Sequence, residues 1–474
     1  MKFTKLIYLF LVSFLLFSCT KADTRKGQSI KNAERPNFVI VYCDDLGYGD
    51  IGSFGATDIK TPNIDRMAAE GIKFTEFYSA SSVCSPSRAA LLTGRIPQRM
   101  GVNGVFFPES YTGMPLEEIT IADILKKDGY ATGIVGKWHL GHMEKFLPLQ
   151  RGFDEYFGIP YSNDMESVVY LRGNEVVDFN VDQRYITKTY TEEAIKFIEN
   201  HKNEPFLLYL AHNMPHVPIY ASEDFLGTSE RGLYGDVIQE IDWSVGQVIK
   251  KLEDNHLLSN TLIIFTSDNG PWLAMEDYGG SAGILREGKQ FTFEGGQRVP
   301  TIAMWPTKIK GGQVYDDLAV MMDWFPTIAG IAGADVPNDR SYDGTDISQV
   351  LFGTGTRKGP GFLYFDLDEL QGYREGDWKI KLPYKGYNGS NWKQAVAPHP
   401  MLLINLKNDP GEQHNLAEEM PEKLQEMLHK MDSAKNALGI LPPSLVIRTG
   451  ADNSHYLYLN KKHEGKNYWE KKWE

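Results

Sequence analysis

The chain has 474 residues, of which 42% are hydrophobic and 23% are charged, as in globular proteins with a large core. This composition excludes a disordered, collagen-like or multi-span membrane protein. The formal net charge is −13, from 49 Lys and Arg against 62 Asp and Glu. We therefore expect no nucleic-acid partner, whereas a small anion can still bind in a local cationic pocket.

The first segment has the features of an export signal. Two lysines precede an apolar stretch over 6–16, which is too short to span a membrane stably. It runs into L-F-S-C at 16–19, which resembles the lipobox of bacterial lipoproteins. We predict a signal peptide over 1–18, lipidation of Cys19, a polar tether over 19–35 and a lipid anchor in the bacterial cell envelope, at the outer membrane on its periplasmic or surface side. The alternative is ordinary secretion with a free Cys19.

From Pro36 onward, short apolar runs alternate with helical segments. The runs are typical of buried strands and lie at 38–43, 72–77, 131–135, 206–210, 262–266 and 301–305. Helices are predicted at 62–70, 191–201 and 234–255. This alternation predicts an α/β fold with a mostly parallel sheet sandwiched by helices. In such sheets, ligands bind beyond the carboxyl ends of the strands.

The pattern changes after residue 355. Short strands are predicted at 362–365, 378–382 and 401–406, followed by a helix over 421–438. Because short turns join these strands, we expect a smaller α+β subdomain with an antiparallel sheet. The predicted boundaries are 36–355 for the main domain and 356–474 for the C-terminal subdomain.

Polar residues directly follow two of the predicted strands. Asp44 and Asp45 follow the first, and Asp268 and Asn269 follow the strand that ends at Thr266. Together they offer four oxygen donors, the kind of ligand that Ca²⁺ and Mg²⁺ require. One such pair alone is more often a turn or a helix cap, but two pairs at strand ends favour a metal site.

Cys84 opens the segment C-S-P-S-R-A-A-L-L-T-G-R at 84–95, most of which is predicted to be helical. We expect Ser85 to cap this helix and Pro86 to take its first position. Cys84 would then lie at the positive end of the helix beside the charge of Arg88, where anions bind. A buried structural Cys is the alternative, but it fits poorly beside Ser, Pro and Arg. The spacing of Cys and Arg is too short for a tyrosine-phosphatase loop, and the local papain signature is absent.

The segment at 84–95 resembles the signature of the type I sulfatases, whose Cys is oxidised during export to Cα-formylglycine. Seven more segments between Pro36 and Leu416 resemble blocks of that family in the same order: N-F-V-I-V-Y-C-D-D-L-G-Y-G-D (37–50), T-P-N-I-D (61–65), G-K-W-H-L-G (136–141), P-H-V-P (215–218), S-D-N-G (267–270), G-K-Q-F-T-F-E-G-G-Q-R-V-P (288–300) and D-P-G-E-Q-H-N-L (409–416). G-I-P-Y-S-N-D (158–164) is similar to the branch of arylsulfatase A and N-acetylgalactosamine-6-sulfatase.

The resemblance implies an alkaline-phosphatase-like fold and assigns roles to individual residues. It implies one Ca²⁺ per chain held by Asp44, Asp45, Asp268 and Asn269. It implies that Cys84 matures to formylglycine (3-oxoalanine), which is both nucleophile and metal ligand, through a formylglycine-generating or anaerobic sulfatase-maturating enzyme. The catalytic residues that it implies around the sulfate group are Arg88, Lys137, His139, His216 and Lys289. His212 is a rival for the role of His216, but the P-H-V-P context favours His216.

The chemistry of a sulfate monoester explains these residue types. The ester is anionic, so a divalent ion and three cationic side chains can neutralise its oxygens in the transition state. One hydroxyl of the hydrated aldehyde would attack sulfur and displace the alcohol. The second would then lose its proton to His139, and sulfate would be expelled. His216 or Lys289 would protonate the leaving alkoxide.

The prediction for function is a lipid-anchored sulfatase that acts on sugars of sulfated polysaccharides or their oligosaccharides, from algal or host glycans. The alternatives are an arylsulfatase, a phosphonate or phosphate ester hydrolase of the same fold and, in a different class, a glycan-binding lipoprotein with an inactive site. The candidate substrate-binding residues are Asp164, Arg172, Trp272, Trp392 and His399.

Overall fold

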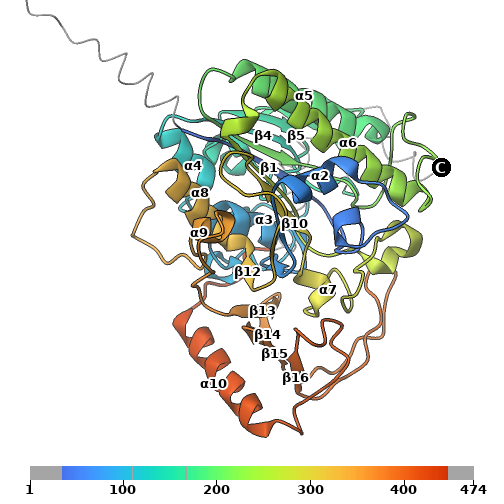
Figure 1. Ribbon diagram of the computed structural model, residues 1–474, viewed down its shortest axis with the longest axis vertical. Helices are drawn as coiled ribbons and strands as arrows, with labels where there is room; N and C mark the ends of the chain where they lie inside the picture. Colours follow the sequence, from blue (N-terminus) through green and yellow to red (C-terminus); the bar gives the residue numbers. More distant parts are fainter. Residues whose placement is uncertain (1–34, 109, 166–167, 447–474) are drawn as a thin grey trace, which may run out of the picture. The chain divides into compact units, whose positions relative to one another are not determined.

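A ten-stranded sheet forms the centre of the computed structural model, which describes residues 35–108, 110–165 and 168–446 (Figure 1). Its order is β11-β2-β10-β9-β1-β8-β4-β5-β6-β7, and the five strands from β9 to β5 are mutually parallel. The strands are β1 (Asn37–Cys43), β2 (Ile72–Phe74), β4 (Ala131–Gly136), β5 (Glu155–Gly158), β6 (Tyr170–Arg172), β7 (Glu175–Asp178), β8 (Phe206–Ala211), β9 (Thr261–Ser267), β10 (Thr301–Met304) and β11 (Gln313–Tyr315). The predicted signal peptide, Cys19 and nearly all of the tether lie outside the described residues.

Helices cover both faces of this sheet (Figure 1). One face packs on α2 (Pro62–Glu70), α5 (Ile186–Asn200) and α6 (Leu233–Asp254), and the other on α3 (Cys84–Thr93), α4 (Ile121–Lys127) and α8 (Trp324–Ala332). Successive side chains of a strand point to opposite faces, so both sets in β1 are buried, and β1 is therefore apolar along most of its length. The prediction of a mostly parallel sheet between helices is confirmed.

The shorter elements connect these layers. They are α7 (Glu294–Gln297), α9 (Ser348–Leu351) and the 3₁₀ helices η1 (Gly52–Phe54), η2 (Pro97–Met100), η3 (Glu144–Phe146), η4 (Pro148–Gln150), η5 (Gln183–Tyr185), η6 (Leu258–Asn260), η7 (Leu273–Tyr278) and η8 (Met321–Asp323). Within the described part of the chain, no helix combines the length and the apolar character needed to cross a membrane.

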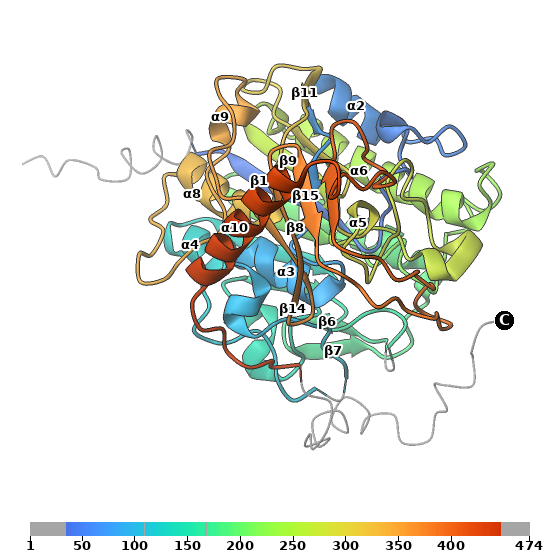
Figure 2. The ribbon, with the colours of Figure 1, turned by 90° about the horizontal axis from the view of Figure 1, so that it is seen from below.

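A separate antiparallel sheet confirms the predicted change of architecture after residue 355. Its strands, in order, are β13 (Phe362–Asp366), β14 (Glu369–Glu375), β15 (Trp378–Lys381) and β16 (Leu402–Asn405). The helix α10 (Pro421–Ala437) packs on this sheet through Met427 and Met431, and Figure 2 shows it crossing in front of the strands. The proposed domain boundary at 355/356 stays a prediction.

Buried charges join the second sheet to the segment of chain that contains α7. The Glu294 carboxylate accepts hydrogen bonds from Lys379 Nζ and from the Tyr364 hydroxyl, both at 2.9 Å. Lys379 Nζ also lies 2.8 Å from a Glu412 carboxylate oxygen. A buried charge is tolerated only when it is paired, so these contacts hold the two parts of the chain in a defined register.

The predicted strand over 72–77 is wrong in one respect, because the chain breaks there. β2 ends at Phe74, and a second strand, β3 (Phe77–Tyr78), pairs with β12 (Ala319–Val320) in a different, two-stranded sheet. Between them, the Thr75 amide donates to the Tyr315 carbonyl, and the Glu76 carboxylate pairs with Arg374 of the second sheet. The chain thus leaves the central sheet after Thr75 and enters the two-stranded sheet at Phe77.

Candidate active site

The carboxyl ends of four neighbouring parallel strands carry the polar residues of the site. Because β9, β1, β8 and β4 are adjacent and parallel, the residues that follow them meet at one edge of the sheet. Seven residues follow these strands, and all of them are buried. They are Asp44 and Asp45 after β1, Asp268 and Asn269 after β9, Lys137 and His139 after β4, and His216 after β8.

The acidic residues form a compact group of oxygen donors. The Asp45 amide donates to Asp268 Oδ1 at 3.1 Å, and Asn269 Nδ2 donates to Asp45 Oδ1 at 2.7 Å. One ligand atom from each of Asp44, Asp45, Cys84 and His216 lies within 4.8 Å of the others. Within the described chain, the buried atoms Asp44 Oδ1 and Asn269 Oδ1 have no hydrogen-bond partner. Buried oxygens without hydrogen-bond donors are what a hard divalent cation requires, so this group fits a metal ion.

Three cationic side chains balance the three carboxylates. Arg88 donates to Asp268 Oδ2 through Nη2 at 2.8 Å and through Nε at 3.1 Å. Lys289 Nζ donates to Asp45 Oδ2 at 2.7 Å, and Lys137 Nζ pairs with Asp44 Oδ2. The formal charges of these six groups cancel, so a bound dication would leave an excess of positive charge. An anionic substrate can compensate that excess, which couples metal binding to anion binding.

The environment shifts the carboxyl groups in opposite directions. Burial raises the pKa of Asp268 to about 7, and repulsion from Asp44 adds to this effect, while Arg88 opposes it. Burial also acts to raise the pKa of Asp44, but Lys137, His216 and Arg88 outweigh it and hold that pKa well below its usual value. Of these two carboxyl groups, Asp44 therefore remains charged more readily than Asp268.

Cys84 is the first residue of α3, and Val83 takes the position of the N-cap. The expectation that Ser85 caps the helix is wrong, because the Ser85 hydroxyl instead accepts a hydrogen bond from the Phe106 amide at 3.2 Å. Burial raises the pKa of the Cys84 thiol well above its usual value, although Lys137 and Lys289 act against this shift. An unmodified thiol here is protonated at neutral pH and is a weak nucleophile.

His139 is held as a neutral imidazole with a defined tautomer. Its Nε2 lies 2.9 Å from the Phe106 carbonyl oxygen, which can only accept, so Nε2 carries the hydrogen. Burial lowers the pKa of His139 well below its usual value, and the charges of Lys137 and Arg88 lower it further. Within the described chain, Nδ1 has no hydrogen-bond partner, so a lone pair is available there.

The structure separates the two rival histidines. His216 Nε2 lies 3.6 Å from Asp45 Oδ2, and its Nδ1 lies 2.5 Å from the Val217 carbonyl oxygen. His212 instead contacts the Ser244 hydroxyl on α6 through Nε2 at 3.2 Å, and burial lowers its pKa to about 3. His216 therefore belongs to the site, whereas His212 is a buried residue between the sheet and α6.

Ser162 contacts the site, although the sequence did not single it out. Its hydroxyl accepts a hydrogen bond from Lys137 Nζ at 3.1 Å and lies 3.4 Å from His216 Nδ1. The available signal is its place in G-I-P-Y-S-N-D, a segment that resembles the branch as a whole and marks no single residue. Asp164, one of the candidate substrate-binding residues, lies two residues further on and is exposed.

Trp272 and Trp392 extend from the site toward solvent. The ring of Trp272 lies 5.2 Å from that of His216, and Lys289 Nζ lies 4.1 Å from the centre of the Trp272 ring. Trp272 Nε1 donates to the Trp392 carbonyl at 2.6 Å. The structure thus links both tryptophans to the catalytic candidates, as their assignment to the substrate-binding set requires.

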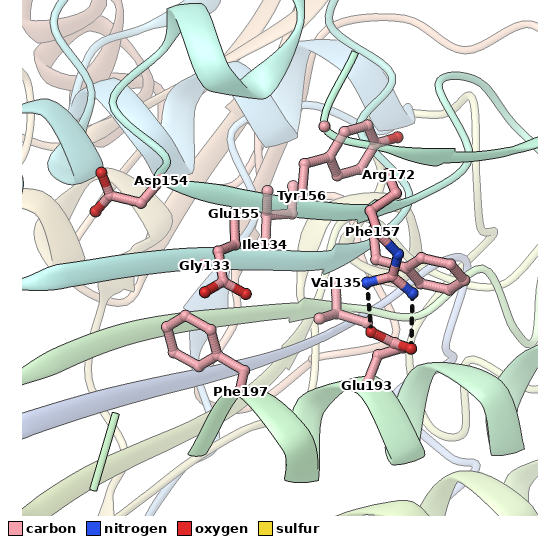
Figure 3. A pocket seen from close by; sticks show the side chains of 11 residues that line it. Gly133, Ile134, Val135, Asp154, Glu155, Tyr156, Phe157, Arg172, Glu193 and Phe197 are labelled. Atoms are coloured by element: carbon pink, nitrogen blue, oxygen red, sulfur yellow. Dashed lines mark hydrogen bonds and ion pairs between the residues drawn. The ribbon is translucent and has the colours of Figure 1, made fainter. Parts of the chain in front are cut away.

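The contacts that the structure gives Arg172 and His399 do not involve the catalytic candidates, and their assignment to the substrate-binding set stays a prediction. Arg172 makes two 2.8 Å hydrogen bonds to Glu193 of α5 and lines a cavity of about 350 Å³ between that helix and the strands β4 and β5 (Figure 3). His399 Nδ1 lies 2.8 Å from the Pro400 carbonyl, and its ring packs against Phe293. Arg172 is thus paired locally, whereas His399 Nε2 is buried without a hydrogen-bond partner among the described residues.

Comparisons with known proteins agree with this geometry. A family model described as Sulfatase matches residues 36–334, and one described as N-sulphoglucosamine sulphohydrolase, C-terminal, matches residues 287–437. Arylsulfatase A of Bos taurus is 39% identical over 441 residues, which cover 84% of this chain and 86% of the relative. N-acetylgalactosamine-6-sulfatase of Homo sapiens is 39% identical over 426 residues, which cover 81% of each chain. The crystal structure of Ps i-CgsB in complex with k-i-k-neocarrahexaose has a TM-score of 0.77 and 28% identity, covering 92% of this chain and 98% of that one.

Proposed function

The chain belongs to the sulfatase family and hydrolyses sulfate esters, and we propose that its substrates are sugars of sulfated polysaccharides or of their oligosaccharides. The observation that carries the proposal is the buried convergence of Cys84 with Asp44, Asp45 and His216, whose ligand atoms lie within 4.8 Å of one another. The names of the relatives support the choice of substrate, since one acts on a sulfated acetylgalactosamine and one was crystallised with a carrageenan-type hexaose.

We assign one Ca²⁺ to the oxygen donors at the ends of β1 and β9, namely Asp44, Asp45, Asp268 and Asn269. The two buried oxygens without hydrogen-bond donors support this assignment. When bound, the ion supplies positive charge to the sulfate oxygens. The chain positions Lys137, Lys289 and Arg88 around the same point, each held by a carboxylate. These side chains are pre-oriented, so little reorganisation is needed as charge develops on the ester.

We further propose that Cys84 matures to Cα-formylglycine through a formylglycine-generating or anaerobic sulfatase-maturating enzyme. The raised pKa of the thiol argues against an unmodified Cys84 as the nucleophile. A hydrated formylglycine at position 84 would supply a hydroxyl group as the nucleophile toward sulfur. Residue 84 lies at the amino end of α3, where the helix dipole favours negative charge on the attacking oxygen and on the ester.

The two histidines divide the proton transfers. His139 is neutral and presents a lone pair at Nδ1, so it can accept a proton from residue 84. His216 donates through Nδ1 to the Val217 carbonyl, which directs Nε2 toward Asp45 and into the site. Protonated His216, or Lys289 beside it, gives a proton to the sugar oxygen when the sulfur–oxygen bond breaks.

The proposal for location is export, followed by lipid anchoring through Cys19 in the bacterial cell envelope. It is supported by the sequence pattern of residues 1–19 alone.

The test of the proposed function is sulfate release from a panel of defined sulfated saccharides, using protein produced together with a maturating enzyme. We expect release from at least one saccharide and none from a Cys84→Ala control. Sulfate and phosphate esters of one phenol are compared in parallel, and faster cleavage of the phosphate ester would overturn the assignment in favour of a phosphate ester hydrolase. Saccharide binding without release, by protein whose Cys84 is still a thiol after production with the maturating enzyme, would favour the binding lipoprotein.

A further inference from the structure

The connection between β15 and β16 forms an irregular hairpin over residues 384–399, here called the 384–399 hairpin. Backbone hydrogen bonds join its two arms at three places, between Tyr384 and His399, Tyr387 and Val396, and Ser390 and Lys393. The hairpin is therefore a built element with a defined tip, and Trp392 lies at that tip.

The base of the hairpin packs on the segment that carries Lys289. Val396 and Tyr384 pack with Phe291 and Phe293, which lie two and four residues after Lys289. Lys393 Nζ lies 4.7 Å from the centre of the Phe291 ring. The second sheet thus places this hairpin directly against the chain that positions one of the proposed catalytic cations.

The tip of the hairpin is fixed to the site by a single hydrogen bond. Trp272 Nε1 donates to the backbone carbonyl of Trp392 at 2.6 Å, and the Trp272 ring contacts His216 and Lys289. Exposure rises along this series, because His216 and Lys289 are buried, Trp272 is half-buried and the Trp392 side chain is 65% exposed. The series leads from the sulfate pocket to solvent.

The composition of the hairpin is suited to a sulfated saccharide. In Y-K-G-Y-N-G-S-N-W-K-Q-A-V-A-P-H there are two Lys and no Asp or Glu, although the whole chain has a net charge of −13. Asn388, Asn391 and Gln394 offer amide groups that can bond sugar hydroxyls, and the exposed Lys385 can attract sulfate groups. Lys393 is less available, because its Nζ lies against the Phe291 and Tyr387 rings and 3.9 Å from Asp366. An indole offers a flat apolar surface that matches the C–H face of a pyranose ring. A large aromatic side chain so exposed, and hydrogen-bonded through its carbonyl to Trp272 beside the proposed catalytic residues, points to a binding role.

We propose that the 384–399 hairpin forms a saccharide subsite beside the sulfate pocket. The sugar that carries the reacting ester lies against Trp272, and the neighbouring sugar of a sulfated oligosaccharide stacks on Trp392. The inference rests on the proposed function, because it specifies the part of the substrate that lies beyond the ester. This subsite gives the protein a higher kcat/KM for chains of two or more sugars than for a single sulfated sugar.

The experiment compares a sulfated monosaccharide with an oligosaccharide that carries the same ester on its terminal sugar. In wild-type protein, kcat/KM is expected to be higher for the oligosaccharide. Trp392→Ala retains the backbone carbonyl that Trp272 needs, and it should lower kcat/KM for the oligosaccharide by about tenfold, mainly through KM, as expected for the loss of one stacking contact. The ratio of kcat/KM between the two substrates should fall accordingly, and Trp392→Phe should restore most of it.

Phe352→Ala is the matched control, because Phe352 is also an exposed aromatic residue but contacts Trp305 and lies outside the site. It should leave the ratio unchanged. A second readout is the Kd of the oligosaccharide for Cys84→Ala protein, which should rise when Trp392→Ala is added.

If both substrates release sulfate and Trp392→Ala leaves their ratio unchanged, the subsite is refuted and the proposed function stands. If neither releases sulfate from wild-type protein that carries formylglycine, the proposed function fails and the subsite with it.

Discussion

Two regions differ in how firmly their side chains are held. One is the edge of the central sheet, meaning the carboxyl ends of β9, β1, β8 and β4, and the other is the rim formed by Trp272 and the 384–399 hairpin. At the edge, the single residue Asp45 makes hydrogen bonds with three others, Asp268, Asn269 and Lys289, and all four are buried. At the rim, Trp392 is attached through one backbone hydrogen bond, and most of its side chain faces solvent. The ends of the strands therefore fix the catalytic candidates, whereas the proposed sugar contacts lie on loops, which can change without disturbing those ends.

The largest effect is expected from Cys84→Ala at the edge of the sheet. It removes the proposed nucleophile, so kcat should fall by at least about 10⁴-fold, while the change is small enough to leave the fold intact. Turnover is measured on a sulfated saccharide, and the melting temperature is recorded alongside. Cys43→Ala is the matched control, since Cys43 is the other cysteine of the described chain, is equally buried, and lies in the core that packs on α6. Wild-type turnover in Cys84→Ala would contradict the assigned role.

Removal of the metal tests the same region without a mutation. Dialysis against a chelator should lower kcat/KM by at least about 100-fold, because the sulfate oxygens lose their main source of positive charge. Ca²⁺ should restore activity better than Mg²⁺, since the larger ion accepts more oxygen ligands in a flexible geometry. It should also raise the melting temperature of the chelated protein. Full activity in protein shown by metal analysis to be metal-free would refute the site.

A pair of histidine variants distinguishes the catalytic role proposed for His216 from the structural role of His212. His216→Gln should lower kcat by about 10²- to 10⁴-fold, in the range for loss of a general acid. His212→Gln should act mainly on stability, because His212 is buried between the sheet and α6. Equal loss of turnover in the two variants, at equal stability, would contradict this division.

The pH dependence of unfolding provides a second test of the pair. Burial lowers the pKa of His212 to about 3, whereas an unfolded chain binds that proton near its ordinary value of about 6.5. Between about pH 6.5 and 3, the unfolded state therefore binds a proton at His212 that the folded state does not bind. The free energy of unfolding should fall by about 1.4 kcal/mol for each pH unit over this range as the pH decreases. Urea unfolding of His212→Gln should lack this part of the slope.

The sequence predicted the edge of the sheet better than the rim, for a physical reason. The runs at 38–43 and 262–266 are apolar because both faces of their strands are buried, and the polar residues after them stand out. The strand β14 was missed because E-L-Q-G-Y-R-E is largely polar and only its last part is buried. Its place depends on pairing with β13 and β15, which no local pattern reveals.

Pairs of charged residues from distant segments were the least predictable feature of the molecule. Arg172 was a candidate substrate-binding residue, yet Glu193 on α5 binds it with two hydrogen bonds. The network of Glu294, Lys379 and Glu412 was not foreseen, although it supports the segment that carries Lys289. Such pairs form only when distant segments meet, so their partners cannot be read from spacing along the chain.

The smallest effect is expected from Trp272→Phe, because Trp272 lies between the edge of the sheet and the 384–399 hairpin. Trp272→Phe keeps an aromatic ring beside His216 and Lys289 but removes the Nε1 donor that holds the carbonyl of Trp392. One net hydrogen bond is worth about 1 kcal/mol, so the 384–399 hairpin should become more mobile while the edge of the sheet keeps its geometry. KM for an oligosaccharide should rise by about threefold to tenfold with little change in kcat, and hydrogen exchange in residues 384–399 should accelerate. A fall in kcat with an unchanged KM would show instead that Trp272 supports the proton donors. Trp272 would then belong to the catalytic group, and substrate selectivity would depend on Trp392 alone.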